Sequence, residues 1–264
     1  MQFKFLPPII YNPDNIFGYK NAYRLVCVIL AVVAILIIFF YKENCKPSDD
    51  EGSDLKKKGR GRVWDGIEYS KAVKTAYFYG ALVCLFLTGM VLQGITGVAA
   101  PHLKDVGIDA AYIATVLSVN SLALSGAKFL IGFLYDRFGL RLTTLVSYLS
   151  SIIVMIVLCS ITNSPAGKTF AMMYAILAAV ALPLETVMIP IFSNDLFGEK
   201  SGNKVLGIFA SVNTAGYALG APITNICYDL TGSYNTAFYI AGGLMMLVTI
   251  AMQFIINASN KYKQ

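Results

Sequence analysis

Two ionisable side chains stand within long apolar segments of the sequence, and their chemistry is the most informative. Lys128 lies in the apolar run 110–135, and Glu185 lies in the run 169–193. An ionisable side chain at the centre of a membrane-spanning helix costs about 2.5–3.5 kcal/mol on insertion scales, so such residues usually face a cavity or a partner. Lys128 is therefore a candidate for binding an anion, and Glu185 is a candidate charge partner or proton carrier.

The spacing along the two runs places these side chains at similar depths. Lys128 precedes Asp136 by eight residues and Glu185 precedes Asp195 by ten, which at 1.5 Å per helical residue corresponds to about 12 Å and about 15 Å. If both aspartates mark the cytoplasmic end, the two charges can pair. Simpler interpretations remain open, because the lysine could extend to the lipid headgroups and the glutamate could cap a polar neighbour.

A short polar pattern occurs twice in the chain. Residues 118–121 read SVNS and residues 211–214 read SVNT, at similar positions in their apolar runs. In transporters built from inverted repeats, corresponding helices carry substrate-binding groups near the middle of the membrane. The alternative is that these polar groups bond to neighbouring helices or to the backbone. The candidate substrate-binding residues of the two segments are Asn120, Asn213, Thr214 and Tyr217.

The elements that hold these residues are predicted to be membrane-spanning helices. Of the 264 residues, 56% are hydrophobic and 14% charged, whereas a typical globular domain has about 25% charged residues. Apolar runs of about 20 residues, the length that crosses the hydrocarbon core, recur along the chain. The sequence thus predicts an all-α membrane protein with about seven transmembrane helices. They are expected at 22–41, 76–97, 110–135, 140–161, 169–193, 204–226 and 234–257.

The distribution of lysine and arginine predicts the orientation. Fifteen of these residues lie in the loops on one side and five in those on the other, and basic loops stay in the cytoplasm. The N-terminus is therefore expected outside and the C-terminus in the cytoplasm, in the cell membrane. The predicted parts are an outside segment (1–21), one helix (22–41), a cytoplasmic linker (42–75), a six-helix unit (76–257) and a cytoplasmic tail (258–264).

The loop after the run 110–135 carries the most specific motif. Residues 132–141 read GFLYDRFGLR, which resembles the G-x-x-x-D-R-x-G-x-R signature between helices eight and nine of major facilitator transporters. Gly132 is expected to permit close helix approach, while Asp136, at the negative end of its helix, needs a cation or another helix N-terminus. The simpler interpretation is that the arginines only hold the loop in the cytoplasm. The predicted gating motif consists of Gly132, Asp136, Arg137, Gly139 and Arg141.

Three further segments, 97–107, 195–198 and 219–234, resemble the oxalate/formate antiporter family and its monocarboxylate-transporter relatives. This resemblance implies secondary active transport of a small organic anion by alternating access. In that family a cation, usually arginine, occupies the position of Lys128 and meets the substrate carboxylate. Family members that exchange dicarboxylates have a second cation on helix eleven, which this chain lacks after Lys204, so a monocarboxylate is the expected substrate.

The resemblance also implies that the chain is incomplete at its start. The helix 22–41 would correspond to the sixth of twelve, and 76–257 would form the C-terminal half from two inverted three-helix repeats. We therefore expect a missing N-terminal half as a partner. One alternative is a fragment without activity of its own. Another is a seven-helix receptor, although the last predicted span lacks the proline typical of that class.

Other chemistries find no support in the sequence. The single histidine, His102, is predicted to lie in an outside loop beside Pro101, so neither a catalytic triad nor a histidine metal site is available. The five cysteines form no close pair, and membrane orientation explains the net charge of +6 better than nucleic-acid binding does. We therefore expect no enzyme activity, metal or cofactor.

Overall fold

The computed structural model describes residues 24, 27, 28, 30–32, 35 and 66–262. The chain divides into two units, 1–59 and 60–264. In the first unit, the few described residues of the predicted helix 22–41 are helical. The outside segment 1–21, the remainder of that helix and most of the linker fall outside the described residues.

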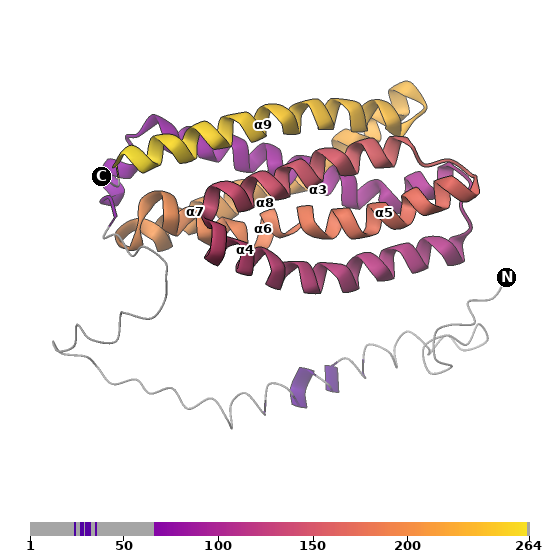
Figure 1. Ribbon diagram of the computed structural model, residues 1–264, viewed down its shortest axis with the longest axis horizontal. Helices are drawn as coiled ribbons and strands as arrows, with labels where there is room; N and C mark the ends of the chain where they lie inside the picture. The colour runs from indigo at the N-terminus through magenta and orange to yellow at the C-terminus, as the bar shows by residue number, and fades with distance from the viewer. Residues whose placement is uncertain (1–23, 25–26, 29, 33–34, 36–65, 263–264) are drawn as a thin grey trace. The chain divides into compact units, whose positions relative to one another are not determined.

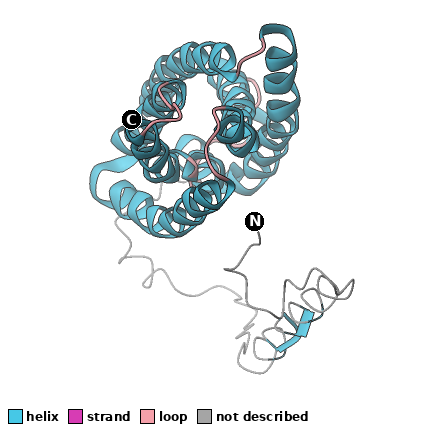
Figure 2. Ribbon diagram, turned by 90° about the vertical axis from the view of Figure 1, so that its right-hand side faces the viewer, coloured by secondary structure: helices cyan, strands magenta, loops and turns pink. Residues whose placement is uncertain are grey.

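The described part of the second unit is almost entirely helical, which confirms the all-α prediction. Its helices run along a shared direction, and Figure 2 shows many of them end-on. Five stretches are long and apolar enough to cross a membrane: 76–105, 110–159, 165–186, 200–231 and 234–260. The helices are α2 (Tyr69–Ala72), α3 (Ala76–Asp105), α4 (Ala110–Cys159), α5 (Pro165–Ala181), α6 (Pro183–Thr186), α7 (Met188–Phe197), α8 (Glu199–Thr231) and α9 (Tyr234–Tyr262).

The longest helix, α4, covers two of the predicted spans. Its 50 residues would extend about 75 Å if straight, more than twice the thickness of the hydrocarbon core. Gly139 interrupts it with φ 79° and ψ 178°, a conformation that is almost restricted to glycine. Figure 1 shows α4 turning back on itself, so that its arms 110–138 and 140–159 run in opposite directions along the bundle.

The predicted span 169–193, in contrast, is broken into α5, α6 and α7. Pro183 is the first residue of the four-residue helix α6. Proline has no backbone N–H, and its ring clashes with the carbonyl group four residues earlier, so a continuous helix is disfavoured here. The break matters for function because α6 contains Glu185.

Close packing between α3 and α8 depends on residues without side chains. A Cβ atom on Gly216 would collide with the Phe86 carbonyl oxygen, and one on Gly220 would collide with that of Met90. Small residues let membrane helices approach until their backbones touch, and this contact replaces the hydrophobic drive that is absent in lipid. The second main contact in the bundle joins α4 to α5.

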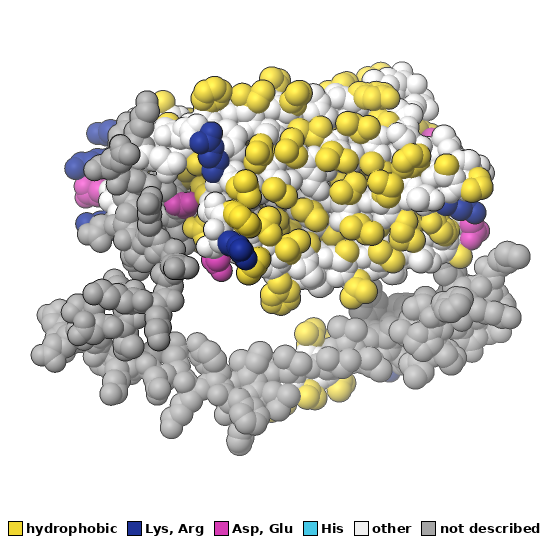
Figure 3. Space-filling model, viewed as in Figure 1, with side chains coloured by type: hydrophobic (Ala, Val, Ile, Leu, Met, Phe, Trp, Pro, Cys, Tyr) yellow, Lys and Arg dark blue, Asp and Glu magenta, His cyan; other side chains and the backbone are white. Residues whose placement is uncertain are grey.

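The surface of the bundle suits a bilayer. Figure 3 shows the charged side chains of one face grouped toward its two ends, with a broad hydrophobic area between them. Large apolar side chains are exposed on the long helices, among them Phe129 (83%), Leu247 (66%) and Phe254 (69%). In water such an area would be a liability, whereas in lipid it is the expected outer surface.

The predicted loop position of His102 is wrong. The helix α3 continues through Pro101 to Asp105, beyond the predicted end of its span at residue 97. His102 is consequently buried, and its Nε2 lies 2.9 Å from the Leu158 carbonyl oxygen of α4. Its ring edge packs against Phe238 of α9, with the centroids 5.0 Å apart. The proline misled the prediction, because a membrane helix tolerates it where neighbouring groups satisfy the backbone.

Candidate functional site

Lys128 lies at the end of a row of hydroxyl groups on the first arm of α4. Ser118, Ser121, Ser125 and Lys128 are all exposed, and their spacing of three or four residues places them on one face of the helix. We call these four residues the α4 polar stripe. The serine hydroxyls donate to the carbonyl oxygens of Ala114, Leu117 and Ser121 at 2.8, 3.0 and 3.2 Å. The ammonium group is thus the one charge on a face of satisfied but exposed hydroxyl groups.

A second row of polar groups lies on α8. Ser211, Thr214 and Tyr217 are exposed and three residues apart, and we call them the α8 polar stripe. The hydroxyls of Ser211 and Thr214 donate to the carbonyl oxygens four residues earlier, both at 2.8 Å. These local bonds leave the oxygen lone pairs available as acceptors. Unlike the α4 polar stripe, this stripe carries no charge.

The two asparagines of the repeated pattern lie beside these stripes, at helix contacts. The Nδ2 of Asn120 donates to the Ala175 carbonyl oxygen of α5 at 2.8 Å. Asn213 is 6% exposed and packs against Gly89 of α3, where a Cβ atom would collide with the asparagine backbone and side-chain oxygens. Asn120 thus bonds its helix to a neighbour, as the alternative interpretation expected, whereas the buried Oδ1 of Asn213 has no hydrogen-bond partner among the described residues. Direct substrate binding by either one stays a prediction.

Glu185 occupies the break between α5 and α7. Its Oε1 is buried, and within the described residues it has no hydrogen-bond partner. The backbone around it is tightly wound, with the Glu185 N–H donating to the Leu182 carbonyl oxygen at 3.1 Å. The carboxyl group also lies within electrostatic range of the Tyr217 hydroxyl. The broken helix therefore holds an unpaired carboxyl group within electrostatic range of Tyr217 in the α8 polar stripe.

The predicted gating motif is an open turn in this chain. No atom would lie within 4 Å of a Cβ on Gly132, so no helix in the described part of the chain approaches this glycine closely. Asp136 and Arg137 are exposed, and the Arg137 guanidinium lies 5.7 Å from the centre of the Phe138 ring. The Arg141 carbonyl oxygen accepts a hydrogen bond from Gln253 of α9 at 3.2 Å. Residues 66–262 supply no hydrogen bond or ion pair to the carboxylate of Asp136.

Comparison with known proteins decides the family. The sequence profile of the Major Facilitator Superfamily matches residues 81–264. The chain belongs to the Major Facilitator Superfamily. It is also similar to monocarboxylate transporter 13 of Bos taurus, with 27% identity over 195 residues, which cover 70% of this chain and 44% of that protein. The chain therefore spans less than half the length of this relative.

Membership of the superfamily confirms the resemblance that the turn motif indicated. The chain is thus a multi-pass membrane protein of a family of transporters and not of enzymes. The alternative of a seven-helix receptor is overturned. In a superfamily transporter the exposed rows on α4 and α8 are candidate walls of a substrate pathway, and the broken helix with Glu185 is a candidate coupling element.

The structure brings some of the predicted site residues together and leaves others apart. Glu185 and Tyr217 lie near one another, whereas no hydrogen bond or ion pair among the described residues joins Glu185 to Lys128. Sequence reasoning noted Ser118 and Ser121 only as part of a repeated pattern and missed Ser125 and the alignment of these serines with Lys128. Their signal was present, because Ser118, Ser121 and Ser125 share the helical spacing that leads to Lys128.

Proposed function

We propose that this chain forms the C-terminal half of a secondary active transporter that moves a small organic anion, a monocarboxylate, by alternating access. The observation that carries the proposal is the α4 polar stripe, in which Lys128 is the one cation on an exposed hydroxyl-lined face of a membrane helix. The similarity to a monocarboxylate transporter supports the substrate class. In this proposal, residues 76–257 contain two inverted three-helix repeats.

Lys128 would hold the carboxylate of the substrate. A charge-assisted hydrogen bond is stronger than a neutral one, and exclusion of water strengthens the attraction between the two charges. The hydroxyl groups of both polar stripes can orient the remainder of a small molecule, with Thr214 and Tyr217 facing it from α8. A single cation matches a single carboxylate, and the α8 polar stripe offers no charge for a second one.

Glu185 would balance the charge of the pathway. Its buried Oε1 has no hydrogen-bond partner among the described residues, and an uncompensated buried charge is costly. A proton bound to this carboxyl group would remove that cost, and its release would couple to movement of the anion. Tyr217, within electrostatic range of Glu185, connects the carboxyl group to the face where the substrate would bind.

The polar stripes lie on faces that are exposed in this chain, so the opposite wall of the pathway must come from elsewhere. We propose that an N-terminal half supplies it, which is consistent with the 44% coverage of the bovine relative. The second candidate function is therefore a fragment that is inactive alone. In either case we place the end of the bundle with the Gly139 turn in the cytoplasm, because Arg137 and Arg141 lie there.

Binding of monocarboxylates tests the proposal. The chain is co-expressed with the N-terminal half of the bovine relative, and the Kd for lactate and pyruvate is measured in detergent, with oxalate for comparison. We expect Lys128→Gln to weaken binding at least about tenfold, since a hydrogen bond to a charged group contributes about 1.5–3 kcal/mol. Lys128→Arg should retain part of the affinity because it keeps the charge. Lys104→Gln, at an exposed lysine near the end of α3, is the matched control.

Two outcomes would contradict the proposal in different ways. An unchanged Kd in Lys128→Gln would show that the lysine only extends to the headgroups, which would overturn the site but not the family. Absence of binding in the co-expressed wild type would favour the inactive fragment. Glu185→Gln provides a second test: uptake should lose its dependence on a proton gradient, whereas a purely structural glutamate would lower the yield of folded protein.

A further inference from the structure

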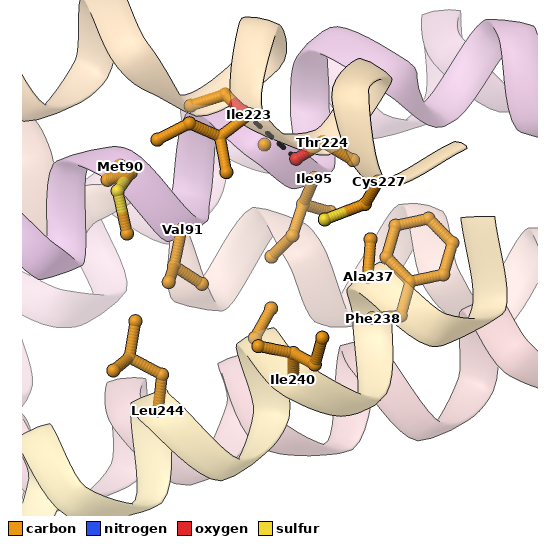
Figure 4. Close-up of a pocket in the computed structure, with 13 residues that line it drawn as sticks. Met90, Val91, Ile95, Ile223, Thr224, Cys227, Ala237, Phe238, Ile240 and Leu244 are labelled. Carbon is orange, nitrogen blue, oxygen red and sulfur yellow. Dashed lines mark hydrogen bonds between the residues drawn. The ribbon is translucent and has the colours of Figure 1, made fainter. Parts of the chain in front are cut away.

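A cavity lies between α3, α8 and α9, away from the polar stripes. Figure 4 shows its walls, which consist almost entirely of apolar side chains from these three helices. Its volume is about 70 Å³, and because one water-sized group needs about 10–15 Å³ on this measure, roughly five such groups fit. The side chains that shape it include Val91, Ile95, Ile223, Phe238, Ile240 and Leu244.

The walls offer almost nothing to a polar occupant. The one hydroxyl group, that of Thr224, donates to the Gly220 carbonyl oxygen at 2.9 Å. The remaining polar atom of a side chain belongs to the Cys227 thiol, which is a weak donor and acceptor. A buried water needs about two to four polar partners. The cavity therefore favours an apolar occupant over water.

The mouth of the cavity lies on the side of α8 that suits lipid. Exposed large apolar residues form a row on this helix, and Ile223, which lines the cavity, belongs to it and is 41% exposed. At 100° per residue this row and the α8 polar stripe are about 150° apart. Ile240 of α9, 60% exposed, stands at the same mouth. The members of the row are Leu219, Ile223, Ile226 and Leu230.

The cavity is also elongated parallel to the helix axes, as the acyl chain of a lipid in a bilayer would be. Its wall on α8 runs from Gly220 to Cys227, and its wall on α9 runs from Ala237 to Leu244. Both walls follow the helix axes for about 10 Å, and both begin near the α8–α9 turn and extend toward the middle of the bundle. An acyl chain that hangs from a headgroup at this end of the bundle would run parallel to both walls.

We propose that this cavity binds one acyl chain of a membrane phospholipid, which enters between α8 and α9 and packs against α3. The site is independent of the transported substrate. The acyl chain fills space beside the close contact of α3 with α8, where a Cβ on Gly94 or Gly220 would collide with the facing helix. The bound lipid thereby adds apolar packing beside this contact.

Photo-crosslinking in vesicles tests this proposal with the full chain. The vesicles consist of palmitoyl-oleoyl phosphatidylcholine with a small fraction of an analogue that carries a diazirine on one acyl chain. We expect labelling of Ile223, Cys227 and Ile240 to exceed that of Phe254, an exposed lipid-facing residue of the same bundle, by about tenfold, which corresponds to about 1.4 kcal/mol of preference. The excess should also be saturable by unlabelled lipid.

Two variants separate a specific site from general contact with lipid. Ala241→Trp fills the cavity and should remove the excess labelling, whereas Leu247→Trp, on the exposed surface of the same helix, should keep it. If Ala241→Trp does not fold, saturation in the wild type still decides. Labelling equal to that of Phe254, labelling that does not saturate, or no labelling because another protein segment fills the cavity would each overturn the proposal.

Discussion

Two turns of this chain have the same backbone and opposite surroundings. Residues 136–139 read DRFG and residues 195–198 read DLFG. Gly139 has φ 79° and ψ 178°, and Gly198 has φ 78° and ψ −179°. Each turn ends one helical arm and begins the next. The shared Asp-x-Phe-Gly pattern thus produces the same reversal of direction at two places in the bundle.

The aromatic residue of each turn shows how different the surroundings are. Phe197 is completely buried, and its ring centre lies 5.1 Å from that of Tyr77, 5.6 Å from that of Phe78 and 5.8 Å from that of Phe209. Phe138 is 56% exposed, with Arg137 as its neighbour on the ring face. Phe197 is part of the core, whereas Phe138 lies on the surface of the described bundle.

The second turn also holds the segment that precedes α3. The Ile67 N–H donates to the Phe197 carbonyl oxygen at 3.0 Å, and the Ser201 hydroxyl donates to the Ile67 carbonyl oxygen at 2.8 Å. The Lys204 ammonium lies 5.7 Å from the centre of the Tyr69 ring. The part of the predicted linker that the structure describes is therefore fastened to this turn. The Asp-x-Phe-Gly motif determines the reversal of chain direction. The residues packed around each turn determine whether it is buried in the core or exposed.

The largest expected difference between the turns comes from removing each phenylalanine. Phe197→Ala should lower the free energy of unfolding by about 3–5 kcal/mol, because it leaves a cavity in an aromatic cluster. Phe138→Ala should change it by less than about 0.5 kcal/mol, as an exposed substitution does. Thermal unfolding in detergent, followed by reaction of the buried Cys84 thiol with a fluorescent dye, measures both. Equal losses would mean that the 136–139 turn is packed as tightly as the other.

Backbone strain should act on both turns alike. Gly139→Ala and Gly198→Ala should each cost about 1–3 kcal/mol, because the φ and ψ values at these positions are nearly restricted to glycine. No atom would lie within 4 Å of a Cβ on Gly139, so any loss there reports conformation and not collision. Gly132→Ala is the matched control and should be neutral or stabilising by up to about 1 kcal/mol, since Gly132 is helical. If Gly132→Ala is destabilised, the result would support the close helix approach at Gly132 that the sequence predicted.

The sequence was sufficient for the helical class of the fold and for most of the long helices among residues 66–262, because apolar length is a local signal, but it did not predict the break of the span 169–193 at Pro183. It failed where neighbouring helices decide the outcome. His102 looked like a loop residue beside a proline, but its contact with Leu158 keeps it inside the bundle. The roles of Asn120 and Asn213 depended on which face of each helix meets a neighbour, and no local pattern states that.

For the candidate site, the helical spacing of polar residues carried information that the sequence analysis used only in part. Lys128 was identified from its type and depth, while the helical spacing that places Ser118, Ser121 and Ser125 on the face of Lys128 was not used although it was visible. The electrostatic interaction between Glu185 and Tyr217 required the tertiary arrangement, since the two residues lie on different helices, α6 and α8. Pairing of Glu185 with Lys128 stays a prediction.

The smallest expected effects on folding come from replacing the aspartate of each turn, Asp136 or Asp195, by asparagine. Asp136 is exposed at the C-terminal end of a helical arm, where the helix dipole disfavours a negative charge by about 0.3–1 kcal/mol. Asp136→Asn should therefore leave the unfolding temperature unchanged or slightly raised. Asp195→Asn, at a half-buried position in the packed turn, should lower it.

In a complete transporter, Asp136→Asn should nevertheless shift the balance between inward-open and outward-open states. If the turn contacts the other half of the transporter in only one of the two states, removing the charge of Asp136 changes the free energy of that state alone. The populations of the two states then shift. The measurement is the rate of thiol labelling at single cysteines placed at each end of the pathway, compared with Phe138→Ala as a second exposed variant of the same turn. If both rates of Asp136→Asn match the wild type while folding is intact, the turn only marks a cytoplasmic loop, and the difference between the two turns has no consequence for transport.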